Sequence, residues 1–248
     1  MYKAFLFDFD GTLVDTDHLF LDSLNEVLTY SGIRPGTKQE YITFHGTNGI
    51  ISDRLKGFRE DVSRIIAEEL QKELLKIYNH KIESGHLRFL PGAVDFLKAL
   101  KREGLPAFIV TNKPHDMADK EISILNMRSL IAGHIGADNG YAQKPSPEML
   151  IAAAEFLNVR KEECIMIGDH TNDLLAAVSA GMPSIILDRG RNLVHTESMS
   201  PDITVENLRE LLSVTDINGL RPLVEKGMIQ SSRKYSTPYI DLDFEFSL

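Results

Sequence analysis

Residues 4–12 read AFLFDFDGT, an apolar run that gives way to two aspartates and a glycine. The run lacks the alternation of a strand with one face in water, so it predicts a strand over residues 4–9 that is covered on both faces, as in a parallel sheet. Alternation along an extended backbone sends the side chains of Asp8 and Asp10 to the same side. Carboxylates this close repel each other, which favours a nearby cation or a catalytic task. The alternative is a turn with solvated acids.

Further apolar runs follow along the chain, and helical patterns separate them. The runs lie at 107–110, 164–167 and 184–187, and the helical patterns at 93–101, 147–157 and 172–180. Strands that alternate with helices predict an α/β fold with a doubly wound, Rossmann-like parallel sheet. Ligands of such folds bind at the carboxyl ends of the strands.

One segment, from about residue 16 to residue 88, interrupts this rhythm. It contains apolar stripes at helical spacing over 20–28 and 62–77 and no convincing strand. We therefore expect an α-helical cap domain at 16–88, inserted into a core domain made of 1–15 and 89–212.

The remaining residues, 213–248, form a C-terminal extension to which the sequence assigns no role. Within it, residues 239–248 alternate between apolar and polar side chains, a pattern typical of a half-buried strand. Such a strand could join the edge of the sheet or pair with a second subunit, so both a monomer and a homodimer stay open.

Composition narrows the functional classes. A hydrophobic content of 43% is enough to bury a core without metal or disulfide cross-links. The net charge of −9 and the absence of a basic cluster argue against nucleic acid and anionic membranes as partners. The single cysteine, Cys164, lies in an apolar run and is expected to be a buried hydrophobic residue. Residues 1–9 lack the features of a signal peptide, and a cytoplasmic location is expected.

Polar residues also follow the other predicted strands. Thr111 and Asn112 end the run at 107–110, and Asp169 ends the run at 164–167, with Asp173 one helical turn later. Lys144 precedes a predicted helix. Taken singly, Thr111, Asn112 and Asp169 could be helix caps and Lys144 a solvated surface charge. Together they lie near one edge of the predicted sheet, which favours a single site.

This set of residues suits phosphoryl transfer. Asp8 is an oxygen nucleophile, and Asp8 and Asp169, with water and a backbone carbonyl, offer the hard oxygen ligands that Mg²⁺ prefers. Lys144 adds a fixed positive charge, and Thr111 can hold phosphate oxygens. Asp10 is placed to protonate the leaving oxygen and later to activate water.

These residues resemble the motifs of the haloacid dehalogenase superfamily, in its phosphatase branch. Residues 8–16, DFDGTLVDT, are similar to the first motif almost letter for letter. Thr111 matches the second motif, Lys144 the third, and Gly168-Asp169 with Asp173 the fourth. The insert is similar in position to the helical cap of phosphoglycolate phosphatases and β-phosphoglucomutases.

The resemblance implies a role for each matching residue. Asp8 is expected to be phosphorylated, with Asp10 as the acid/base. The other implied roles are phosphate binding by Thr111, Asn112 and Lys144, Mg²⁺ binding by Asp8, Asp169 and the backbone carbonyl of Asp10, and support from Thr12 and Asp173.

The expected function is therefore hydrolysis of a small phosphorylated metabolite by an Mg²⁺-dependent phosphatase, whose substrate the sequence leaves open. A sugar phosphomutase is an alternative, since it would use the same residues and return the phosphoryl group to a second hydroxyl. A catalytically silent module that binds phosphate is a third possibility, although none of Asp8, Asp10 and Lys144 is lost.

Overall fold

The computed structural model describes residues 2–37, 64–189 and 200–212. Within these residues six parallel strands form one sheet in the order β3-β2-β1-β4-β5-β6. The strands are β1 (Ala4–Phe7), β2 (Ala107–Val110), β3 (Gly133–Ile135), β4 (Cys164–Gly168), β5 (Ser184–Leu187) and β6 (Ile203–Val205). The predicted doubly wound parallel sheet is confirmed.

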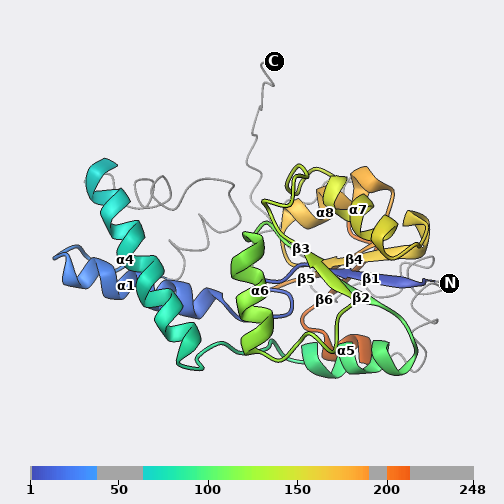
Figure 1. The fold of residues 1–248 in the computed structure, drawn as a ribbon, viewed down its shortest axis with the longest axis horizontal. Helices are drawn as coiled ribbons and strands as arrows, with labels where there is room; N and C mark the ends of the chain where they lie inside the picture. Colours follow the sequence, from blue (N-terminus) through green and yellow to red (C-terminus); the bar gives the residue numbers. More distant parts are fainter. Residues whose placement is uncertain (1, 38–63, 190–199, 213–248) are drawn as a thin grey trace, which may run out of the picture.

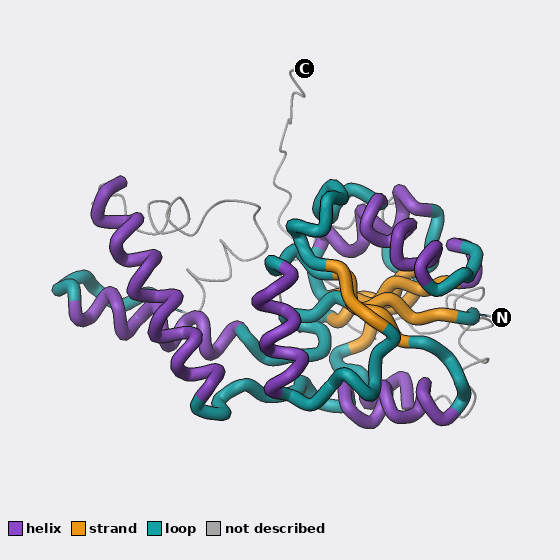
Figure 2. Tube along the Cα trace, viewed as in Figure 1, coloured by secondary structure: helices purple, strands orange, loops and turns teal. Residues whose placement is uncertain are grey.

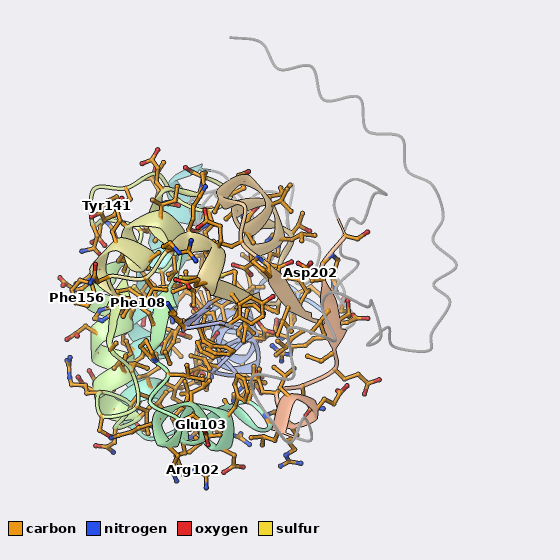
Figure 3. All side chains as sticks on the ribbon, turned by 90° about the vertical axis from the view of Figure 1, so that its right-hand side faces the viewer. Arg102, Glu103, Phe108, Tyr141, Phe156 and Asp202 are labelled. Atoms are coloured by element: carbon orange, nitrogen blue, oxygen red, sulfur yellow. The ribbon has the colours of Figure 1, made fainter. Side chains whose placement is uncertain are left out.

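Helices cover both faces of this sheet (Figures 1 and 2). One face carries α5 (Ala93–Arg102), α6 (His115–Ile124) and α9 (Arg209–Leu212). The other face carries α7 (Glu148–Phe156) and α8 (Thr171–Ala180). A short 3-10 turn at Lys161–Glu163 lies between α7 and β4. Alternation along β1 divides the core between the faces, because Phe5 and Phe7 pack toward α5 while Leu6 packs toward α7. At the edge of the second face, Phe156 of α7 lies against Phe108 of β2, with ring centroids 5.3 Å apart (Figure 3).

The strand boundaries agree closely with the apolar runs predicted from the sequence, with one correction. β2 and β5 match the predicted runs, β4 is one residue longer, and Cys164 is buried as expected. The first strand was predicted to reach Phe9 but ends at Phe7. The chain turns there because the amides of Leu13 and Val14 both donate to the carbonyl of Phe9.

Two helices, α1 (Asp17–Tyr30) and α4 (Arg64–Glu83), form the described part of the insert. They pack against each other through an apolar cluster that includes Leu24, Leu28 and Leu74. Figure 1 shows the pair beyond α6, on the side away from the sheet. The predicted helical character is confirmed for the described residues of the segment, while the exact domain limits stay a prediction. The predicted strand at 239–248 and the start of the stripe at 62–77 lie outside the described residues.

The two chain segments that connect the insert to the sheet lie side by side. Val14 and Phe89 form an antiparallel bridge. The amide of Asp15 donates to the carbonyl of Arg88 at 2.9 Å, and the amide of Leu90 donates to Leu13 at 2.9 Å. The insert therefore leaves and rejoins the core at one place. None of the helices in the described ranges is both long and apolar enough to cross a bilayer.

Candidate active site

The order of the strands places the site. β1 lies between β2 and β4, and the chain adds strands on one side of β1 before it crosses to the other. This reversal is the switch point at which doubly wound sheets bind ligands. Thr111 follows β2, Asp8 follows β1 and Asp169 follows β4, so the three residues come from the carboxyl ends of neighbouring strands.

Lys144 is the centre of a buried hydrogen-bonded group. Its ammonium donates to Asp8 Oδ1 at 2.8 Å, to Asp173 Oδ1 at 2.7 Å and to the carbonyl of Val110 at 2.7 Å. An ammonium has three protons, and three acceptors use them. Burial alone would lower the pKa of Lys144, but the carboxylates of Asp173 and Asp8 raise it, so the lysine stays charged although it is only 2% exposed.

Asp8, a second member of this group, also has a shifted pKa. Burial raises the pKa of Asp8 to about 6, and the ammonium of Lys144 opposes that shift. The carboxylates of Asp173 and Asp10 add to the rise. An ionised Asp8 therefore needs positive charge beyond that of Lys144.

The carboxylates provide a place for that charge. One oxygen from each of Asp8, Asp169 and Asp173 lies within 4.8 Å of the others. The group sets three buried acids against one lysine, and its oxygen donors are of the type that Mg²⁺ prefers. The observed residues therefore fit the metal that the sequence predicts.

Asp173 and Thr12 brace this group. Asp173 Oδ2 accepts hydrogen bonds from the amides of Asp169 and His170, at 3.2 and 3.0 Å. The Thr12 hydroxyl donates to Asp169 Oδ1 at 3.2 Å. Because both oxygens of Asp173 already accept hydrogen bonds, its contacts suit the supporting role that was predicted for it. His170, rather than Asp169, caps α8, since its side chain accepts from the amide of Asn172.

Gly168 allows Asp173 to come this close. A Cβ atom at position 168 would overlap the carboxylate of Asp173. The glycine that ends β4 is thus required by the packing of a neighbouring acid.

Asn112 contacts the backbone of Lys144. Its amide nitrogen donates to the Lys144 carbonyl at 2.7 Å, and its amide oxygen accepts from the Lys144 amide at 2.9 Å. The Thr111 hydroxyl accepts from the amide of Lys113 at 3.1 Å. Phosphate binding by Thr111 and Asn112 stays a prediction, and the observed contacts of Asn112 hold the lysine loop.

Asp10 has a partner that sequence reasoning missed. The ammonium of Lys113 lies 2.8 Å from Asp10 Oδ1 and 2.6 Å from Glu121 Oε2. Glu121 lies on α6 beside the buried residues Ala118 and Ile122. An acid on an otherwise apolar helix face indicates a buried partner. A predicted helix over 115–124 would have placed Glu121 on such a face.

The chain matches the family model of the haloacid dehalogenase-like hydrolases over residues 5–187. It belongs to this family. The match spans β1 to β5 and thus includes every residue assigned to the site.

Curated relatives cover most of the chain. The phosphoglycolate phosphatase of Photorhabdus laumondii is 28% identical over 222 residues, covering 88% of this chain and 94% of the relative. The phosphoglycolate phosphatase of Escherichia coli K12 is 29% identical over 230 residues, covering 85% and 91%. The prediction of a phosphatase from this family is confirmed.

Solved structures support the fold. A predicted phosphoglycolate phosphatase from Haemophilus somnus superposes with a TM-score of 0.75 at 23% identity, over 87% of this chain and 98% of that one. CbbY from Rhodobacter sphaeroides, solved in complex with phosphate, gives a TM-score of 0.68 at 24% identity, over 85% and 96%.

Proposed function

We propose that this chain is an Mg²⁺-dependent phosphatase that hydrolyses a small phosphate monoester through a phosphoaspartate on Asp8. The observation that carries the proposal is the contact of Lys144 with both Asp8 and Asp173 beside Asp169. A buried nucleophile, a fixed cation and a cluster of hard ligands are the parts that phosphoryl transfer requires.

In the first step an oxygen of Asp8 forms a bond to phosphorus while the bond from phosphorus to the ester oxygen breaks. Asp10, in its protonated form, gives its proton to the leaving oxygen. In the second step Asp10 takes a proton from water, whose oxygen bonds to phosphorus as the bond to Asp8 breaks. Phosphate leaves, and both aspartates return to their starting states.

Asp8, Asp169 and the backbone carbonyl of Asp10 would hold Mg²⁺, which would supply the positive charge that lets a carboxylate approach an anionic phosphate. Lys144 restrains the Asp8 carboxylate and adds a fixed charge beside it. Thr111 presents its hydroxyl at the end of the adjacent strand, where it is placed to hold a phosphate oxygen.

The first substrate to test is 2-phosphoglycolate, because the curated relatives are phosphoglycolate phosphatases. Xylulose 1,5-bisphosphate, with which a variant of CbbY was crystallised, is the second. Phosphate release is measured from both and from a panel of metabolite monoesters, with Mg²⁺ and with EDTA.

The matched control is Asp8→Asn, which keeps the size of the side chain and removes the nucleophile. We expect turnover of at least one monoester by the wild type with Mg²⁺, none with EDTA and none by Asp8→Asn. The proposal is wrong if no monoester in the panel is hydrolysed, or if Asp8→Asn retains turnover.

A further inference from the structure

Lys113 occupies a buried position between two acids from different elements. It follows β2, and its ammonium contacts Asp10 after β1 and Glu121 on α6. The Lys113 side chain is 9% exposed, that of Glu121 2% and that of Asp10 22%. The acid/base is thus the most accessible member of a chain of charges that runs into the protein.

Aromatic rings enclose the Lys113 ammonium. It lies 5.2 Å from the ring centroid of Phe9 and 5.9 Å from that of Tyr78. The Tyr78 hydroxyl lies 3.5 Å from Glu121 Oε1. The two rings and the two acids together restrict the position of the Lys113 ammonium.

Tyr78 belongs to the insert rather than to the sheet. It lies on α4, packs edge-on against Phe20 of α1 and is 4% exposed. Figure 1 shows α6 between α4 and the sheet. The contacts Asp10–Lys113–Glu121–Tyr78 therefore connect the carboxyl end of β1 to the insert.

We propose that Lys113 is a positioning residue that fixes the carboxylate of Asp10, and that Glu121 and Tyr78 hold Lys113 in place, so that helix α4 takes part in orienting the acid/base. This inference rests on the role of Asp10 in the proposed function. A carboxylate free to rotate spends less time aligned with the leaving oxygen, and misalignment costs rate in the proton-transfer step.

The direct test replaces the buried ion pair by apolar groups, in the double variant Lys113→Met/Glu121→Leu. Removing the lysine alone would leave Glu121 buried and unpaired, whereas replacing both partners is commonly tolerated. Thermal unfolding of the variant checks that it is folded. The control is Lys120→Met, which removes a solvent-exposed ion pair between α6 and Glu83 of α4.

We expect kcat for an alkyl phosphate such as 2-phosphoglycolate to fall about 10- to 100-fold in the double variant, within the range of acid–base catalysis. KM should change less than about threefold, and Lys120→Met should match the wild type. Phosphoenzyme formation from p-nitrophenyl phosphate, whose leaving group needs little protonation, should be nearly unchanged in rapid-quench measurements.

The deciding comparison adds Asp10→Asn. If Lys113 acts by positioning Asp10, the double variant has little further effect once Asp10 is Asn. Equal losses in both backgrounds, no loss in either, or an equal loss in Lys120→Met would overturn the inference.

Tyr78→Phe keeps the ring and removes the hydroxyl. Its kcat should fall by a smaller factor than that of the double variant, because a hydrogen bond of 3.5 Å holds Glu121 less firmly than the ion pair with Lys113 does. A kcat equal to that of the wild type would remove Tyr78 from the inference. Turnover that survives Asp8→Asn would instead overturn the proposed function itself, so the two failures are distinguishable.

Discussion

The ammonium of Lys144 lies 2.8 Å from Oδ1 of Asp8, and the same ammonium lies 2.7 Å from Oδ1 of Asp173. A single buried cation thus separates two carboxylates from different elements, one after β1 and one in α8. The arrangement orients Asp8, the proposed nucleophile, before a substrate arrives, and it makes the stability of the fold depend on residues that we propose for catalysis.

Replacing Lys144 by Met should therefore abolish turnover and destabilise the protein. Asp8 and Asp173 would be left buried without their shared partner, a loss of about 3–5 kcal/mol in the free energy of unfolding. Urea unfolding at pH 7 measures it. The control is Lys3→Met, whose exposed pair with Glu163 should contribute about 1 kcal/mol or less. Equal effects of the two substitutions would contradict the central role of Lys144.

The stability of the metal-free protein should depend on the ionisation of Asp8. The folded-state pKa, about 6, lies above the ordinary value of 3.8. The stability contributed by Asp8 is fully present below about pH 3.8 and is lost as the pH rises through 6. In EDTA, Asp8→Asn should therefore be more stable than the wild type at pH 8 by up to about 3 kcal/mol, and this advantage should shrink toward pH 4.

Magnesium should reverse that advantage. The ion would bind the wild type through Asp8 and stabilise it by mass action, whereas Asp8→Asn lacks one of the ligands. Thermal unfolding of both proteins with EDTA and with Mg²⁺ makes the comparison. A melting temperature of the wild type that does not respond to Mg²⁺ would contradict the metal site.

Gly168→Ala tests whether the position of the Asp173 carboxylate beside β4 matters for stability and for turnover. The added methyl would overlap the carboxylate of Asp173 and displace it from Lys144, although no catalytic group is altered. We expect a loss of about 1–3 kcal/mol in stability and a fall in kcat. Gly168 does not have a positive φ, so backbone strain should not add to the effect of the methyl group. Full activity of Gly168→Ala would show that the position of Asp173 is unimportant.

Asn112→Ala distinguishes two roles for the Asn112 side chain, holding the Lys144 loop and binding phosphate. If Asn112 holds the Lys144 loop through its two backbone hydrogen bonds, the variant loses about 1–3 kcal/mol of stability in the absence of any ligand. If Asn112 acts only by binding phosphate, stability stays unchanged while inhibition by inorganic phosphate weakens. We expect the loss of stability, measured by urea unfolding in phosphate-free buffer.

The sequence predicts the central strands and the residues at their ends because two-sided burial leaves an unmistakable apolar run. β3 and β6 were not predicted, because they are short edge strands without a long apolar run. β3, for example, contains a glycine and a half-buried histidine. Asp8 and Asp169 could be placed at one edge of the sheet because each follows such an apolar run. Lys113 and Glu121 could not be paired, because their contact joins a loop to a helix that was not predicted.

The paired segments at Val14 and Phe89 have a consequence for how such enzymes diversify. The chain leaves the core and returns to it through two neighbouring segments that are hydrogen-bonded to each other. These two segments therefore place little restriction on the length of the chain inserted between them. The insert could therefore be replaced by one of another length, provided that the replacement keeps the contact between Tyr78 of α4 and Glu121 of α6.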